Sequence, residues 1–149
     1  MKPVASSGLP PALLEQPADP SYGVPVPFVC VRDDGPYGVG TLNRRRVVQC
    51  ALSRICAMCG RSLDNPLVLV GSAEEVARNA LRIPPMHADC ADAALTVYAV
   101  LPGVVLDHPP ADRAWVRVVT GGFDLERPTE RGGRITFRPN SVLPDTAGG

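Results

Sequence analysis

The clearest pattern in the sequence is an amphipathic stretch near its middle. Between residues 44 and 55, apolar side chains recur at the spacing that places them on one face of an α-helix. Thr41 or Asn43 is suited to cap its start, because either side chain can accept a hydrogen bond from a free backbone N–H group. We therefore predict a helix of about three turns that leads into the segment after it.

Two more helices are predicted between residues 72 and 100. Ser72 and Glu75 have the spacing of a capping box, which indicates a short helix from the cap to about residue 81. Pro85 is placed as a first-turn proline of a longer helix, which we expect over residues 86–100. Prolines and glycine at either side of that range limit its length.

Four segments have the composition of short strands. They are residues 27–32, 65–70, 114–120 and 134–142, rich in valine, isoleucine and aromatic residues and bounded by turn-forming residues. The last two are separated by a glycine-containing loop, so the simplest arrangement is a C-terminal antiparallel hairpin. Together with the helices, this predicts a small α+β domain.

The ends of the chain lack such patterns. Residues 1–27 hold seven prolines and only three charged residues, which predicts an extended or disordered arm without regular helix. The folded domain is expected over residues 28–142, and residues 143–149 are expected to form a disordered tail.

Composition places the chain in a broad class. With 149 residues and 45% hydrophobic residues, it can form one domain with a modest core, and its formal net charge of zero gives no overall attraction to nucleic acid or acidic membranes. No apolar run is long enough for a membrane span or a secretory signal, so we expect a cytoplasmic protein. Arginine accounts for all but one of the fifteen basic residues. In this respect the sequence resembles small proteins of GC-rich bacteria.

Two pairs of residues have the spacing of metal ligands. Cys56 and Cys59 are separated by two residues and followed by Gly60, which readily adopts the backbone angles of a tight knuckle. His87 and Cys90 have the same separation at the start of a predicted helix, so they can face one ion. The four side chains would form a complete Cys3His set. The alternative is that they are ordinary buried cysteines beside a capping histidine.

This arrangement resembles treble-clef zinc fingers, in which a knuckle and the first turn of a helix each provide two ligands. The resemblance covers about residues 54–100 and implies bound Zn²⁺, with Asp89 as a candidate hydrogen-bond acceptor next to the ligands. Four protein ligands close the coordination sphere, as in structural rather than catalytic sites. Some treble clefs are HNH-type nucleases, but those carry a further histidine between the half-sites, and none lies between Cys59 and His87 here.

Three other candidate residues are expected to have ordinary roles. Cys30 and Cys50 are predicted to be core residues, although Cys50 precedes the knuckle closely enough to be a fifth thiol near the site. His108 lies beside two prolines and is predicted to be a surface loop residue. It is also the one imidazole not assigned to the metal.

Three consecutive arginines begin the first predicted helix. Arg44, Arg45 and Arg46 oppose the helix dipole, so another interaction should favour them. That interaction could be with an anionic ligand, either phosphate or an acidic protein partner. Alternatively, the arginines could pair with Asp33, Asp34 or the acidic middle segment of the chain, or screen the thiolates.

These features favour a zinc-stabilised interaction or regulatory protein that contacts an acidic or anionic partner through its arginines. One alternative is a zinc-finger protein that binds nucleic acid through the same arginines, with affinity that falls steeply as salt rises. Another is a small zinc hydrolase or lyase, in which one ligand is displaced or a pocket near Cys50, Tyr98 or His108 performs the chemistry. The sequence leaves the oligomeric state open.

Overall fold

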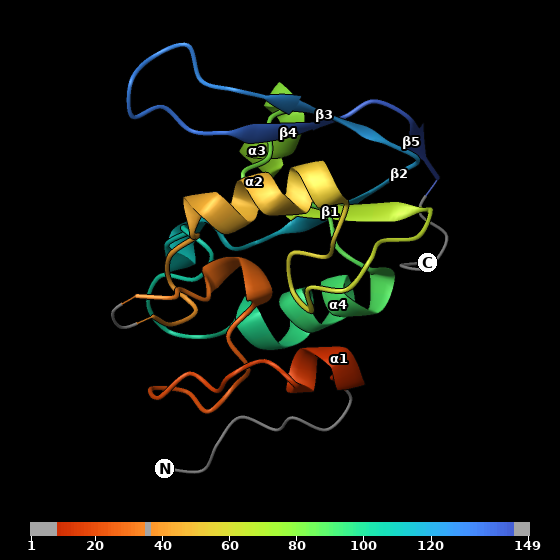
Figure 1. Cartoon of the computed structure of the whole chain (residues 1–149). Helices are drawn as coiled ribbons and strands as arrows, with labels where there is room; N and C mark the ends of the chain where they lie inside the picture. The colour runs from red at the N-terminus through yellow and green to blue at the C-terminus, as the bar shows by residue number, and fades with distance from the viewer. Residues whose placement is uncertain (1–8, 35–36, 145–149) are drawn as a thin grey trace.

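The structure is a computed structural model that describes residues 9–34 and 37–144. It has the α+β fold predicted from the sequence (Figure 1). The helical segments are α1 (Pro11–Leu14), the 3-10 helix η1 (Phe28–Cys30), α2 (Arg44–Ser53), α3 (Ala73–Arg78), α4 (Ala88–Ala93), its π-helical continuation η2 (Ala94–Tyr98), and the 3-10 helix η3 (Pro110–Asp112). The strands are β1 (Leu67–Gly71), β2 (Val116–Thr120), β3 (Phe123–Glu126), β4 (Thr136–Pro139) and β5 (Val142–Leu143).

The strands form two antiparallel sheets. One sheet has the order β1-β2-β5, with Leu67 opposite Thr120 and Gly71 opposite Val116, and the other is the β3-β4 hairpin. An antiparallel hairpin is therefore present near the C-terminus, as predicted, but its strands are β3 and β4 rather than the predicted pair. Residues 114–120 pair mainly with β1, whereas 134–142 pairs mostly with β3. The loop predicted between the two segments contains an additional strand, β3.

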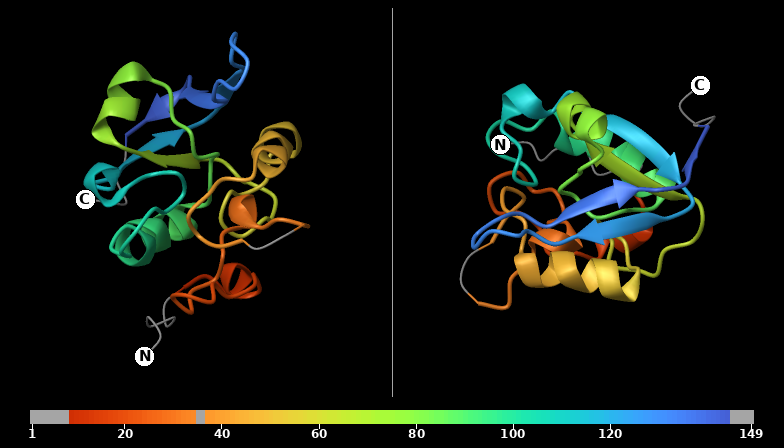
Figure 2. Two further views of the ribbon diagram at one scale, coloured as in Figure 1. Left: turned by 90° about the vertical axis from the view of Figure 1, so that its left-hand side faces the viewer. Right: turned by 90° about the horizontal axis from the view of Figure 1, so that it is seen from above.

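The hydrophobic core lies between these sheets and the helices. All five residues of β1 are buried, because α4 packs against β1 and α3 packs against both β1 and β2. Figure 2 shows the helices and strands wrapped around this shared interior from two further directions. Backbone hydrogen bonds between Leu81 and Phe137, in both directions, attach the hairpin to the segment after α3.

The predicted caps of α2 and α3 are present. Asn43 Oδ1 accepts a hydrogen bond from the backbone N–H of Arg45. Ser72 and Glu75 form a complete capping box, and α3 ends at Arg78 rather than near residue 81.

Among the described residues, no helix has both the length and the apolar composition needed to cross a membrane.

The third predicted helix begins later than expected. α4 starts at Ala88 with His87 as its N-cap, so Pro85 is not in its first turn. Met86 instead exchanges two backbone hydrogen bonds with Val68 of β1, which holds this segment extended. The helical conformation then continues through η2 to Tyr98, close to the predicted end.

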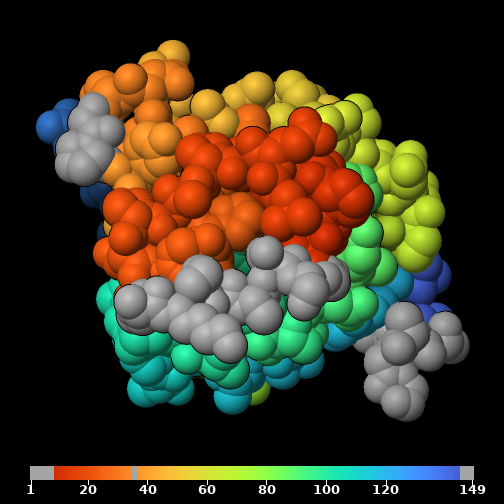
Figure 3. Space-filling view, turned by 90° about the horizontal axis from the view of Figure 1, so that it is seen from below, coloured from red at the N-terminus to blue at the C-terminus, as the bar shows by residue number. Residues whose placement is uncertain are grey.

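The N-terminal segment has more structure than its prolines suggested. The expectation that it contains no regular helix is wrong for α1, where Pro10 and Pro11 occupy positions that tolerate a missing N–H group. Leu13, Val24 and Val26 are buried in the core. Figure 3 shows this segment, in red, spread across the lower face of the molecule. Residues 1–8 and 145–149 of the predicted arm and tail lie outside the described residues.

The strand predicted over residues 27–32 is wrong. Phe28–Cys30 form η1, and the N–H groups of Phe28 and Val29 donate to the carbonyls of Met58 and Ala57. This segment therefore has the knuckle, rather than a neighbouring strand, as its partner. Val29 and Cys30 are consecutive and both buried, so the apparent alternation along the sequence did not reflect a one-sided strand.

Candidate metal centre

The first pair of candidate ligands lies in a tight knuckle after α2. The N–H of Gly60 donates to the carbonyl of Cys56 over 3.0 Å, and Gly60 has a φ of +75°, a conformation that glycine adopts without strain. The N–H of Met58 points to the Sγ of Cys56 at 3.4 Å. This turn directs the side chains of Cys56 and Cys59 to the same side, where both are buried.

The second pair comes from the start of α4. His87 caps the helix and Cys90 lies in its first turn, which places both side chains beside the knuckle. A hydrogen bond from the N–H of Ala57 to the carbonyl of Pro85 fixes the two segments together at 3.0 Å. The four donor atoms all lie within 4.8 Å of one another. Zinc–sulfur bonds of about 2.3 Å set tetrahedral edges of about 3.8 Å, so the cluster is compact enough to surround one metal ion.

The imidazole of His87 is oriented by a hydrogen bond that the sequence did not reveal. Its Nε2 lies 2.8 Å from the carbonyl oxygen of Ser62, an acceptor, so Nε2 carries the proton and donates it. Its Nδ1 lies 3.4 Å from the Sγ of Cys59 and keeps a lone pair directed at the cluster. Metal-binding histidines commonly have such a partner on the other ring nitrogen. Asp89, the candidate for a supporting role, instead accepts from the N–H of Cys90 over 2.9 Å.

The thiols of Cys56 and Cys90 have unequal affinities for protons. Burial alone would raise the pKa of Cys56, but hydrogen bonds from the Cys59 and Cys90 thiols and from backbone N–H groups outweigh it and lower this pKa to about 3. Hydrogen bonding to Cys56 and Cys59 raises the pKa of Cys90. The thiolate of Cys56 is therefore stabilised at the expense of that of Cys90. A bound cation would remove this conflict, because it stabilises all three thiolates together.

The other cysteines are core residues, as predicted. Cys30 and Cys50 are buried, and burial raises the pKa of both thiols, that of Cys50 to about 12. Cys50 lies close enough to Cys56 to interact electrostatically, but it does not belong to the cluster of potential metal ligands found in the described residues. The sequence thus separated the thiols of the site from those of the core.

The three arginines at the start of α2 have different surroundings. Arg46 lies over the ring of Phe28, with its guanidinium carbon 4.3 Å from the ring centre, and forms a 3.6 Å ion pair with Asp33. The Nη1 of Arg44 donates to the carbonyl of Gly133 over 3.1 Å. The exposed side chain of Arg45 has no hydrogen bond or ion pair within the described ranges. Of the three arginines, Arg46 alone forms an ion pair with another described residue, so the intramolecular alternative to a partner applies to Arg46.

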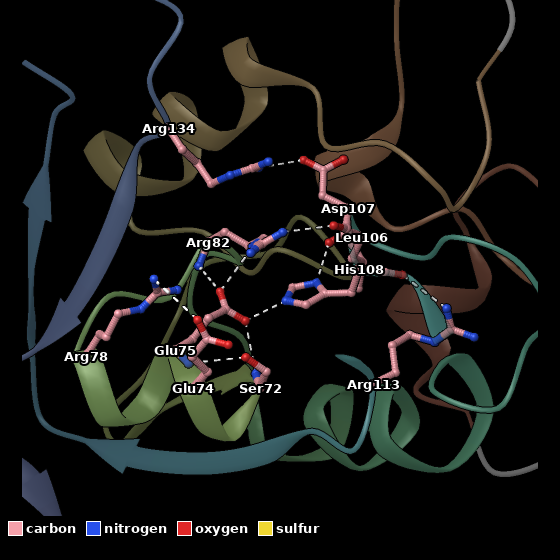
Figure 4. Close-up of polar contacts among 10 residues, drawn as sticks. All are labelled: Ser72, Glu74, Glu75, Arg78, Arg82, Leu106, Asp107, His108, Arg113 and Arg134. Carbon is pink, nitrogen blue, oxygen red and sulfur yellow. Dashed lines mark hydrogen bonds and ion pairs between the residues drawn. The ribbon is translucent and has the colours of Figure 1, made fainter. Parts of the chain in front are cut away.

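The structure corrects the prediction for His108, which is fully buried rather than on the surface. Its Nε2 lies 2.5 Å from Oε1 of Glu75, and its Nδ1 lies 2.7 Å from the carbonyl of Leu106 (Figure 4). Arg82 donates to the other carboxylate oxygen of Glu75 from its backbone N–H and its Nε. With both ring nitrogens occupied and no exposed edge, His108 holds these segments together rather than acting on a ligand.

The cluster can therefore hold a metal ion with three sulfur donors and one nitrogen donor. No further group from the chain is needed for this. A tetrahedral ion with four protein ligands has no position left for water or substrate. No histidine other than His87 and His108 exists in the chain, and neither is free for a second metal.

Comparison with protein-family models, curated proteins and solved structures gives no significant match to the chain.

Proposed function

We propose that the protein binds one Zn²⁺ ion through Cys56, Cys59, His87 and Cys90, and that this ion stabilises the fold. The supporting observation is the convergence of four donor atoms from a knuckle and a helix start, as in a treble-clef zinc finger. Cysteine and neutral histidine form the donor set that zinc prefers in structural sites. The site is closed, so the ion acts on stability rather than on a substrate.

We further propose that the protein is a cytoplasmic interaction or regulatory protein with an acidic partner. All five cysteines are free thiols, which suits a reducing compartment. Arg44 and Arg45 are exposed at the start of α2, where their charges oppose the helix dipole. The stacked and paired Arg46 supports the helix, which leaves Arg44 and Arg45 as the contact residues.

The metal proposal is tested on protein purified without added metal. Elemental analysis should find one zinc per chain, and X-ray absorption at the zinc edge should find three sulfur donors, one nitrogen and no oxygen. Cys56→Ser should lose the ion, whereas Cys50→Ala, which removes a nearby thiol outside the cluster, should retain it. A bound oxygen in the wild-type spectrum would contradict the closed site, and metal-free wild-type protein would refute zinc binding.

The partner proposal is tested with two labelled polyanions, a polyglutamate peptide and a DNA duplex. Fluorescence anisotropy should show binding of the peptide, weakened by Arg45→Glu. Arg138→Glu is a matched control, because Arg138 is an exposed arginine on β4 that pairs with Glu126. Tighter binding of the duplex, with a steep salt dependence, would instead support nucleic-acid binding. Binding of neither polyanion, or equal effects of the two variants, would refute an arginine-mediated partner.

A further inference from the structure

A cavity of about 230 Å³ lies beside the start of α2, away from the cysteine cluster. Arg44, Arg82 and Arg134 line it, and they come from three separate parts of the chain: α2, the segment after α3, and the loop before β4. Asp107 and Gly132 also contribute to its wall. We call this cavity the arginine pocket.

Arg82 is held in place by its other contacts. Its Nε donates to Oε2 of Glu75 over 3.2 Å and its Nη1 donates to the carbonyl of Asp107 over 2.9 Å (Figure 4). Only 22% of its side chain is exposed. Its Nη2 has no hydrogen-bond partner in the described part of the chain. A fixed guanidinium with a spare donor loses little conformational entropy when it binds an anion.

The other two arginines are held more loosely. Arg134 donates from Nη1 to Oδ2 of Asp107 over 2.9 Å, with 48% of its side chain exposed. Asp107 is itself fixed, because its Oδ1 accepts from the N–H of Leu42. Arg44 donates to the carbonyl of Gly133 from Nη1. Each arginine therefore has further donor hydrogens that a ligand can use.

The charge of the pocket indicates the kind of ligand. Three guanidinium groups line the pocket with the carboxylate of Asp107, and Glu75 pairs with Arg82, so these groups together leave one net positive charge. A phosphate monoester carries a charge of about −1.5 to −2 at neutral pH and three terminal oxygens, one for each arginine. Arginine also forms bidentate hydrogen bonds with such oxyanions.

We propose that the arginine pocket binds the phosphate group of a small molecule. The site shares Arg44 with the proposed partner surface, but it depends neither on that surface nor on the metal. Arg82 and Arg134 belong to the pocket alone, and Arg45 belongs to the surface alone. The two proposals can therefore fail separately.

Gly132 offers a test that leaves all three arginines intact. Its φ is +79°, and a Cβ added there would have no atom within 4 Å. Asparagine and aspartate both tolerate this backbone region better than other side chains. Gly132→Asp adds a negative charge at the pocket wall, and Gly132→Asn is its neutral control of nearly the same shape. Arg134→Ala removes one donor, and Arg138→Ala, four residues further on in β4, is the control for loss of an exposed, ion-paired arginine.

Binding of inorganic phosphate, pyrophosphate and a nucleoside monophosphate to the zinc-loaded full chain is measured by isothermal titration calorimetry. We expect saturable binding of at least one probe, and the probe bound most tightly distinguishes free phosphate from a phosphorylated metabolite. Arg134→Ala and Gly132→Asp should each weaken that binding roughly 10-fold or more, the loss expected for one charge-assisted hydrogen bond or its electrostatic equivalent. Arg138→Ala and Gly132→Asn should change it less than about 3-fold.

Absence of saturable binding for all three probes would overturn the proposal. So would binding that Gly132→Asp and Gly132→Asn weaken equally, because shape rather than charge would then be responsible. Thermal unfolding of each variant shows whether it is folded. If Arg134→Ala does not fold, the comparison of the two Gly132 variants still decides the question.

Discussion

Replacement of Glu75 by glutamine should cost the fold a large part of its stability. The carboxylate of Glu75 is 2% exposed and accepts hydrogen bonds from Ser72, Arg82 and His108. Glutamine keeps the shape of the side chain but has one acceptor oxygen and no charge. The cationic group of Arg82 would then lose its counter-ion inside the protein, and the imidazole of His108 would lose its carboxylate hydrogen-bond partner.

Two estimates of the loss in the free energy of unfolding caused by Glu75→Gln agree. Removal of one partner from a buried ion pair typically costs about 3–5 kcal/mol, because the remaining charge stays desolvated. Burial would raise the pKa of Glu75, but the hydrogen bond from His108 and further hydrogen bonds from Ser72 and Arg82 outweigh it and lower this pKa from 4.5 to about 2. That difference corresponds to about 3 kcal/mol in favour of the ionised form in the folded protein.

The same pKa predicts the pH dependence of the wild-type protein. Because the folded pKa is below the unfolded value, the contribution of Glu75 is fully present above about pH 4.5 and is lost as the pH falls toward about 2. The free energy of unfolding should therefore decrease over this interval. In Glu75→Gln this component should be absent, and the remaining slope should come from other carboxylates.

Urea denaturation followed by Trp115 fluorescence provides the assay. Trp115 is a local reporter, since its ring lies edge-on to His108 with 5.4 Å between the ring centres. Glu74→Gln is the matched control, because Glu74 is the adjacent glutamate, is 77% exposed, and pairs with Arg78 in an i, i+4 arrangement on the helix surface. The control should lose less than about 0.5 kcal/mol. If Glu75→Gln is within about 1 kcal/mol of the wild type, the buried ion pair is not the stabilising unit inferred here.

Three further predictions concern the metal site and the helix caps. A zinc chelator should reduce amide hydrogen-exchange protection first in residues 54–100, and Cys90→Ser should show the same early loss without chelator. Uniform loss across the chain would contradict a local role for the ion. Gly60→Ala should lower the free energy of unfolding by about 1–3 kcal/mol in chemical denaturation, because φ is +75° and the added Cβ would lie 2.7 Å from Phe28. An unchanged midpoint would mean that the knuckle relaxes. Ser72→Ala should cost about 1 kcal/mol in the same assay, and its effect should shrink in a Glu75→Gln background if the capping box acts as one unit.

The sequence was most informative where structure depends on neighbouring residues. Asn43 and the pair Ser72 and Glu75 marked helix starts, because a cap requires side chains a few positions apart. The cysteine and histidine spacings likewise brought together both halves of the candidate site. Each half is local, and one shared ion is the simplest reason for two such halves in one chain.

Sequence reading failed where a residue depends on a distant partner. His108 and Glu75 are 33 positions apart, and no spacing rule links a histidine beside prolines to a capping glutamate. Phe28 adopts a 3-10 turn because its N–H group meets the knuckle. The strand at 136–139 pairs with Phe123–Glu126, whose half-exposed alternation was too short to identify as a strand. The arginine pocket was missed for the same reason, since its three arginines come from distant segments.

Several N-terminal residues form hydrogen bonds with the knuckle, which is synthesised after them. The N–H groups of Phe28 and Val29 and the side chain of Gln16 all donate to carbonyls of residues 57–59. The amide of Ala57 in turn needs the carbonyl of Pro85, beyond which the last two metal ligands lie. Gln16, Phe28 and Val29 are therefore synthesised well before the residues that supply their hydrogen-bond acceptors. We expect a nascent chain that ends at residue 60 to be cleaved readily by proteases within residues 9–30, and one that extends past α4 and binds zinc to be protected there.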